Sequence, residues 1–226
     1  MSELQASTLE QLLALRHSCR AFLPRCVPRA VQQQLLALAQ RTASWCNSQP
    51  WQVHITEGAA TERFREQMLA PAAQEESGPD FDWPARYQGV YSQRGRECGL
   101  ALYEGVGIVR GDREASARQA RENFRLFGAP HVAVVTTEAE LGTYGAVDCG
   151  GYVANFLLAA ASLGVATVPQ AALARHPQRI RDFFGLPASR RVVCGISFGY
   201  ADAAHPANAF RTGRAELPDT VAWISD

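Results

Sequence analysis

The chain has 226 residues, 47% of them hydrophobic and 19% charged, which is enough for one domain with a substantial core. Its 22 basic and 22 acidic residues cancel, so no overall field favours a nucleic-acid backbone or an anionic membrane surface as a partner. Every basic residue is an arginine, which excludes Schiff-base chemistry and the lysine of a phosphate-binding P-loop. A glycine-rich dinucleotide signature is also missing, because Gly105-Val106-Gly107 lacks the third glycine.

The six cysteines are scattered, without a Cys-x-x-Cys pair or zinc-like spacing. We therefore expect free thiols, no bound metal and a cytoplasmic location. The first residues lack a basic region followed by an apolar core, so we expect no signal peptide. The most apolar stretch, 153–168, contains Asn155, Ser162 and Gly164 and is too short to span a bilayer, so no membrane partner is expected.

Hydrophobic periodicity predicts helices and strands that are interspersed along the chain. A capping box of Thr8 and Gln11 marks the expected start of the first helix, which ends near Arg16. Further helices are expected at 28–42, 61–69, 84–105, 112–127, through 153–163 and at 177–184, and strands at 51–56, 131–137, 165–168 and 191–200. A polar loop with glycine and two prolines occupies about 71–82. This mixture predicts an α+β or α/β sandwich rather than a helical bundle or an all-β fold.

The C-terminal segment after Ala201 has no core of its own. Leu217, Val221, Trp223 and Ile224 are nevertheless too apolar to be left in water. We expect this segment to pack either on the chain's own core or on a second subunit.

A possible nucleophile motif occurs late in the chain. Gly195-Ile196-Ser197-Phe198-Gly199 matches G-x-S-x-G, the nucleophile turn of serine hydrolases. The context argues against a hydrolase, since a helix should follow the serine directly, and the later acid and histidine could only be Asp202 and His205, which follow too closely. The alternative is a strand end whose small residues pack closely against a neighbour.

A second candidate is the cluster Arg16-His17-Ser18-Cys19-Arg20 just after the first helix. It offers two guanidinium groups, a hydroxyl and an imidazole, which are suitable donors for a phosphate. A solvated surface turn is the alternative, since exposed arginines are common at helix ends.

A third candidate is the loop Trp45-Cys46-Asn47-Ser48-Gln49-Pro50-Trp51. Its amides could pair with the edges of a planar heterocycle and its indoles could cover the faces. The alternative is an ordinary loop in which Trp51 anchors the core.

Two of these segments together resemble a known family. Arg16-His17-Ser18-Cys19-Arg20-Ala21-Phe22, followed one helix later by Asn47-Ser48-Gln49-Pro50-Trp51, closely resembles the two N-terminal signatures of FMN-dependent nitroreductases, and the similarity extends over nearly the whole chain. It is strongest to the nitrobenzoate-reductase-type branch. The resemblance implies a single FMN-binding domain over 1–226 with a variable lid at about 71–127. It also implies an α+β sandwich with a central, mainly antiparallel sheet flanked by helices, in a homodimer whose C-terminal arm, about 201–226, crosses to the partner.

The resemblance also implies where FMN would bind. The phosphate and ribityl chain would be held by Arg16, Ser18 and Arg20 of one protomer, with His17 contributing from the same turn. The tail cations Arg211 and Arg214 would complete the phosphate site. The other protomer would border the flavin with Ser44, Trp45, Cys46, Asn47 and Gln49. A turn beside the ring near N5 would consist of Pro169, Gln170 and Ala171. Arg125 would place a cation near N1 and O2, where it would stabilise the reduced flavin.

The implied activity is a ping-pong reaction at flavin N5. NADH or NADPH would first reduce FMN and leave, and a nitroaromatic or related electrophile would then be reduced, with no obligatory side-chain acid or nucleophile. Three alternatives stay open. They are other flavin chemistry on the same scaffold (dehalogenation, enone or quinone reduction, flavin fragmentation), a Ser197 hydrolase, and a flavin-binding protein without turnover.

Overall fold

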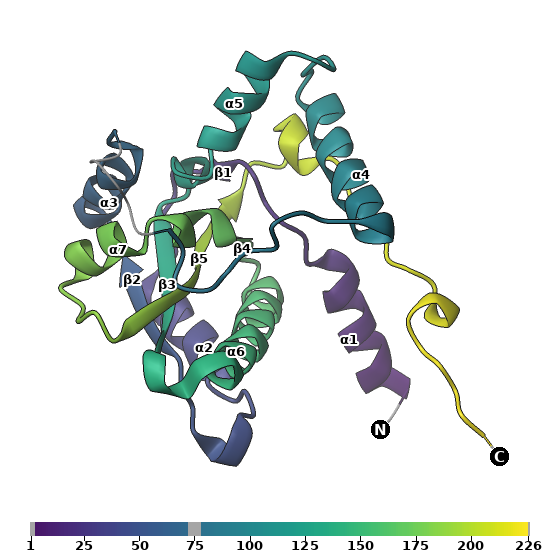
Figure 1. Cartoon of the computed structure of the whole chain (residues 1–226), viewed down its shortest axis with the longest axis horizontal. Coiled ribbons are helices and arrows are strands. Elements are labelled where there is room, and N and C mark those ends of the chain that lie inside the picture. The colour runs from purple at the N-terminus through teal and green to yellow at the C-terminus, as the bar shows by residue number, and fades with distance from the viewer. Residues whose placement is uncertain (1–2, 72–77, 226) are drawn as a thin grey trace.

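A five-stranded sheet forms the centre of the computed structural model, which describes residues 3–71 and 78–225 (Figure 1). The strands are β1 (Phe22–Leu23), β2 (Gln52–Thr56), β3 (His131–Glu138), β4 (Ala166–Gln170) and β5 (Arg190–Ala201). They are hydrogen-bonded in the order β1-β5-β3-β2, β4 also pairs with β5, and each of these pairings is antiparallel. The expected α+β sandwich with a mainly antiparallel sheet is confirmed.

The two faces of the sheet carry separate cores because side chains alternate along β3. Ala133 and Val135 face α2 (Arg29–Ala39) and α6 (Gly142–Ser162). On the opposite face, Val132 and Val134 share a core with residues of α3 (Ala59–Leu69) and α7 (Pro177–Phe184). Seven successive residues of β3, 131–137, are buried, as their β-branched run predicts.

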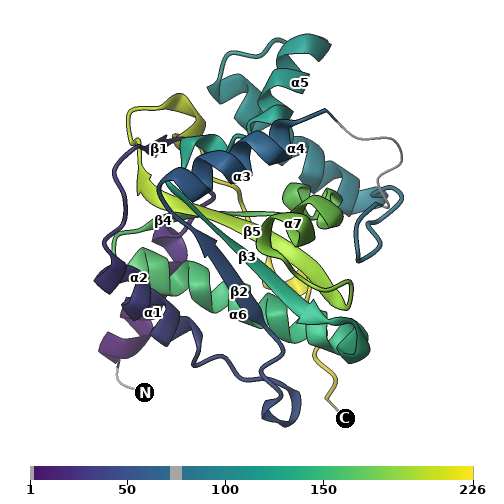
Figure 2. The ribbon, with the colours of Figure 1, turned by 90° about the vertical axis from the view of Figure 1, so that its left-hand side faces the viewer.

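Three further helices lie at the margin of the domain. The helix α1 (Glu3–Leu15) contacts α6, whereas α4 (Gly89–Gly105) and α5 (Arg113–Arg121) contain no buried residue. Both α4 and α5 stand away from the sheet (Figure 1), and α5 is the outermost element at the top of the turned view (Figure 2). Among the described residues, no helix is long and apolar enough to cross a membrane.

Element boundaries differ from the prediction mainly at helix starts. The capping-box prediction was wrong, since Thr8 lies inside α1, which begins at Glu3. The lid-region helices begin later than expected, at Gly89 and Arg113, and α5 ends at Arg121. The long helix α6 extends upstream to Gly142, where several glycines had concealed its start. The predicted loop at 71–82 lies partly outside the described residues.

The C-terminal segment leaves the sheet after Ala201 and runs past α4 (Figure 1). Its apolar residues do not pack on the chain's own core. Leu217, Trp223 and Ile224 are 72%, 89% and 94% exposed, respectively. Of the two possibilities left open by the sequence, packing on the chain's own core was therefore wrong.

Candidate functional site

The segment Arg16–Arg20 after α1, which we call the arginine turn, is fixed against β4. The backbone N–H of Cys19 donates a hydrogen bond to the carbonyl of Thr167 at 2.9 Å, and Ser18 forms an isolated parallel bridge with the same residue. Cys19 itself is fully buried, so the residues on either side of it are directed to the surface of the domain. A single sheet-like contact thus places this turn beside the strand that ends at Gln170.

Asn208 ties the tail to the same turn, a role that the sequence analysis missed. Its Oδ1 accepts the backbone N–H of Arg20 at 2.7 Å, and its Nδ2 donates to the carbonyls of Ala21 and Asp202. The side chain is 7% exposed, so these bonds are shielded from water. No local pattern marks this asparagine, because its two partners in the turn, Arg20 and Ala21, lie more than 180 residues away in sequence.

One cavity of about 550 Å³ brings together all six residues predicted to hold the phosphate end of FMN. We call it the arginine cavity, because four arginines line it. The predicted residues in its lining are Arg16, His17, Ser18, Arg20, Arg211 and Arg214. The sequence analysis missed further lining residues, namely Leu13, Ala14, Cys98, Phe210 and Thr212. Cys98 is contributed by α4, so its place in the cavity depends on how that helix is docked.

The charges of the arginine cavity are not neutralised by the chain itself. Within the described residues, none of Arg16, Arg20, Arg211 and Arg214 forms a salt bridge. Burial lowers the pKa of Arg20 from its ordinary value, because desolvation disfavours the charged guanidinium. Four uncompensated cations around one cavity suit a multiply charged anion such as a phosphate monoester.

Contacts within the chain orient these cations. Arg20 Nη1 donates to the carbonyl of Ser18 at 3.2 Å, and its guanidinium lies 5.5 Å from the ring centre of Phe210. Arg211 donates to the carbonyls of Asn208 and Phe210 at 2.8 Å. Arg214 donates to the carbonyls and hydroxyl of the neighbouring tail residues 212 and 213. These three guanidinium groups are thereby held by carbonyl acceptors while keeping further N–H donors, since arginine carries five.

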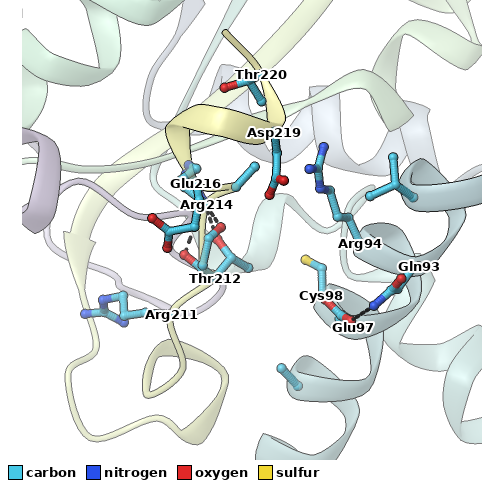
Figure 3. Close-up of a pocket in the computed structure, with 14 residues that line it drawn as sticks. Gln93, Arg94, Glu97, Cys98, Arg211, Thr212, Arg214, Glu216, Asp219 and Thr220 are labelled. Atoms are coloured by element: carbon cyan, nitrogen blue, oxygen red, sulfur yellow. Dashed lines mark hydrogen bonds between the residues drawn. The ribbon is translucent and has the colours of Figure 1, made fainter. Parts of the chain in front are cut away.

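A larger cavity of about 950 Å³ adjoins the arginine cavity and shares Cys98, Arg211, Thr212 and Arg214 with it. Figure 3 shows its two walls, with Arg94 and Cys98 on α4 facing the tail. The two cavities are therefore continuous in their lining, and α4 and the tail together decide how open the site is.

The predicted flavin-edge turn follows directly along β4. Pro169, Gln170 and Ala171 come two to four residues after Thr167, which corresponds to about 7 to 13 Å along an extended strand. The side chain of Gln170 is 2% exposed and is bonded within the protein, whereas Ala171 is exposed. Of these three residues, Ala171 is therefore the one that faces solvent, directly after the strand that is bridged to the arginine turn.

The segment Ser44–Gln49, which we call the amide-rich loop, is held by hydrogen bonds, and its residues 45–49 are exposed. Cys46, Asn47 and Gln49 have φ values of 49°, 55° and 47°, a left-handed conformation that is costly for residues other than glycine. Hydrogen bonds hold the loop in this shape, from Gln49 N–H to Ser44 Oγ at 2.9 Å and from Trp45 N–H to Asp148 Oδ2 at 3.1 Å. Strain of this kind is concentrated at functional sites. Trp51 is 8% exposed and stacked on Tyr152, so it anchors the core, as the alternative interpretation predicted, and it does not cover a ligand.

Within one chain, the amide-rich loop and the arginine turn lie far apart. Trp45 is bonded to Asp148 in the second turn of α6, whereas Ser18 is paired with Thr167 just beyond the C-terminal end of this helix. The stretch of α6 from Asp148 to Ser162 corresponds to a length of about 21 Å. One protomer therefore does not bring the two predicted halves of the site together.

Arg125 does not line the arginine cavity. Its side chain is 61% exposed and lies 3.7 Å from Glu122, and its carbonyl accepts a hydrogen bond from Arg65. Its predicted place near flavin N1 and O2 stays a prediction.

Ser197 does not have the environment of a hydrolase nucleophile. It is fully buried within β5, paired with Val132 on β3 and Val168 on β4, and followed by further strand rather than by a helix. A nucleophile turn has to expose its hydroxyl. The other interpretation of the motif, small residues packed closely on a neighbour, agrees with this position.

Comparison with known proteins agrees with this geometry. The model of the nitroreductase family matches residues 13–200. Nitroreductase NfnB of Mycolicibacterium smegmatis is 35% identical over 223 residues, which cover 96% of this chain and 93% of that protein. A 4-nitrobenzoate reductase of Pseudomonas putida is 30% identical, covering 91% and 90% of the two chains. The crystal structure of FMN-dependent nitroreductase NfnB from Mycobacterium smegmatis in complex with NADPH has a TM-score of 0.92 at 33% identity, covering 98% of this chain and 100% of that one. The chain belongs to the nitroreductase family.

Proposed function

We propose that this protein is an FMN-dependent oxidoreductase that uses NADPH or NADH to reduce nitroaromatic or related electrophilic compounds. The observation that carries the proposal is the arginine cavity, where Arg16, Arg20, Arg211 and Arg214 gather without a salt bridge among the described residues. The relatives support the cofactor and the substrate class, because their names include an FMN-dependent nitroreductase and a 4-nitrobenzoate reductase.

In this proposal the arginine cavity holds the phosphate of FMN. Arg16 and Arg20 donate from the turn, and Arg211 and Arg214 donate from the tail, with Ser18 and His17 beside them. FMN, when bound, supplies the two-electron redox chemistry. The backbone of Pro169, Gln170 and Ala171 lines the edge of the ring. The protein groups therefore bind and orient the cofactor, and no side-chain nucleophile is required.

We further propose a homodimer in which each site is shared. The amide-rich loop is bonded to Asp148 of α6, whereas the arginine turn lies just beyond the C-terminal end of this helix, so the loop of one protomer would border the flavin held by the other. Helices α4 and α5 contain no buried residue, and the tail exposes Leu217, Trp223 and Ile224. A second copy would cover this apolar surface, which is unusual for a monomer.

The cytoplasmic location stays a proposal. It is supported by the cysteines, all six of which are free thiols, as expected in a reducing compartment.

The direct test is reconstitution with FMN. The purified protein should take up FMN, become bleached by NADPH in the absence of oxygen, and regain its colour with 4-nitrobenzoate. A protein that binds no FMN at micromolar concentration would refute the proposal.

Subunit complementation tests the shared site. Arg20→Gln and Asn47→Ala should each impair FMN-dependent turnover, since the two residues belong to opposite halves of the proposed site. Refolding the two variants together should restore about a quarter of the wild-type sites, because half of the dimers are mixed and each has one intact site. The control mixes Arg20→Gln with Arg20→Gln at the same total concentration. Recovery no greater than in this control would contradict a shared site.

A further inference from the structure

The G-x-S-x-G string is built into the wall that supports the proposed flavin-edge turn. Residues 195, 197 and 199 of β5 point to one face of the sheet, opposite residues 170, 168 and 166 of β4. A side chain at Gly195 would place its Cβ 2.4 Å from Leu173 Cδ1, and at Gly199 it would lie 2.7 Å from Pro130 Cδ. Gly195 therefore allows close approach of the segment that follows Gln170, which includes Leu173, and Gly199 allows close approach of Pro130.

A buried chain of hydrogen bonds starts at the serine of this string. The Ser197 hydroxyl donates to Gln170 Oε1 at 2.5 Å, and Gln170 Nε2 donates to the Asn123 carbonyl at 2.8 Å and lies 3.3 Å from Asn123 Oδ1. Ser197 is fully buried and Gln170 is 2% exposed, so water does not compete for these bonds. We call this arrangement the Ser197–Gln170–Asn123 chain.

The chemistry of the three groups fixes the orientation of the Gln170 amide. The Asn123 carbonyl can only accept, so the amide nitrogen of Gln170 has to face it. The amide oxygen then faces Ser197, whose hydroxyl supplies the donor. Without that donor, the amide oxygen of Gln170 would be buried without a partner. The present orientation of the Gln170 amide would then no longer be favoured over other orientations.

The Ser197–Gln170–Asn123 chain of hydrogen bonds joins two parts of the molecule that meet at the proposed site. Gln170 is the last residue of β4, and Asn123 lies between α5 and the 3₁₀ turn Leu126–Gly128, within the variable lid region. Leu126 and Phe127, which follow Asn123, are buried in the core, so the bond from Gln170 joins β4 to a part of the lid region that is already anchored. Because Ser197 is fully buried, its hydroxyl reaches the site through its hydrogen bond to Gln170.

We propose that Ser197 is a positioning residue that sets the flavin-edge turn and the lid relative to each other through Gln170 and Asn123. The proposal rests on the proposed function, since it assumes that Pro169, Gln170 and Ala171 border FMN. FMN affinity depends mainly on the arginine cavity, whereas the position of the turn governs the reactivity of bound FMN.

The test compares Ser197→Ala with Gln170→Met, a swap that keeps the side-chain length and removes both hydrogen bonds. Each variant should slow reduction of bound FMN by NADPH about ten-fold and leave the Kd for FMN within three-fold of wild type. The double variant should reduce bound FMN no more slowly than either single variant, because both substitutions break the same Ser197–Gln170–Asn123 chain of hydrogen bonds. Ser162→Ala is the matched control, since it removes a hydroxyl that is bonded to the Ala159 carbonyl within α6 and takes no part in the Ser197–Gln170–Asn123 chain; it should change neither quantity.

Hydrogen exchange gives a second readout that needs no cofactor. In the FMN-free protein, Ser197→Ala should accelerate amide exchange at least five-fold in residues 122–127 and 169–173, while the buried strand 131–137 exchanges as in wild type. Wild-type exchange in both segments, or additive slowing in the double variant, would overturn the proposal. Failure of the wild-type protein to bind FMN would instead refute the proposed function, and the exchange experiment would still decide whether Ser197 holds the turn.

Discussion

Replacing Arg20 by glutamine should separate FMN affinity from protein stability. Arg20 is the cation of the arginine cavity whose pKa is lowered by burial, and it has no salt-bridge partner among the described residues. In the proposed complex it donates charge-assisted hydrogen bonds to the phosphate. Loss of such a bond costs about 1.5–3 kcal/mol, so Arg20→Gln should raise the Kd for FMN about 10- to 150-fold.

The stability of the FMN-free protein should respond differently. Arg20 loses a bond to the Ser18 carbonyl and a contact with the Phe210 ring when it is replaced. The substitution also removes a partly desolvated charge next to three other guanidinium groups. These effects oppose each other, so we expect the Tm of the FMN-free variant to lie within about 4 °C of wild type.

The two expectations meet in a thermal-shift titration. At FMN equal to 100 times the wild-type Kd, binding stabilises the wild-type protein by about 2.7 kcal/mol. If the Kd rises about 100-fold, the same FMN concentration stabilises Arg20→Gln by only about 0.4 kcal/mol. The matched control is Arg29→Gln, an exposed arginine paired with Glu57 outside the cavity, which should keep the full stabilisation. An Arg20 variant with wild-type FMN stabilisation would refute the phosphate assignment.

Three further predictions follow from named contacts. Truncation after Arg214 removes the exposed apolar tail and should shift a dimer toward monomer in light scattering; a fully dimeric truncation would contradict the role of the tail as an arm. Asp80→Asn leaves Arg181 buried without its carboxylate partner, which lies 2.7 Å away in the wild-type protein. The free energy of unfolding should fall by about 3–5 kcal/mol, and calorimetry should show a Tm about 6–20 °C lower. A Tm change below about 1 °C would show that the pair does not stabilise the fold. Desolvation lowers the pKa of His131, which accepts the Val27 N–H at 2.9 Å, so the folded state binds fewer protons than the unfolded state. The free energy of unfolding in urea should therefore fall as pH drops below about 6.5. His131→Gln should flatten this pH dependence, and an unchanged slope would exclude His131 as its source.

Local sequence patterns determined most of the secondary structure. The β-branched run 131–137 predicts β3, and the helix at 177–184 is bounded by Pro177 and by Gly185, whose φ of 63° suits a left-handed C-cap. These features depend on neighbouring residues, and the structure confirms them. The start of α6 was missed because its first ten residues include four glycines, which weaken a helical pattern.

The arginine turn could be predicted as an anion site because its donors are adjacent in sequence. Arg16, Ser18 and Arg20 need only a fixed backbone to face one cavity, and the bond from Cys19 to Thr167 supplies it. The tail arginines entered the prediction through family resemblance, and Asn208 is the contact that joins the tail to the turn.

The sequence by itself determined every strand except β1, most helices and the residue types of the site, because each depends on side chains a few positions apart. Only the tertiary structure decided that Ser197 is buried beneath Gln170 and that Cys98 reaches the arginine cavity. It also decided that Ser44–Gln49 and the arginine turn lie beside different parts of α6. These facts depend on contacts between segments distant in the chain, and the free energy that selects them comes from burial and hydrogen bonding across the whole fold.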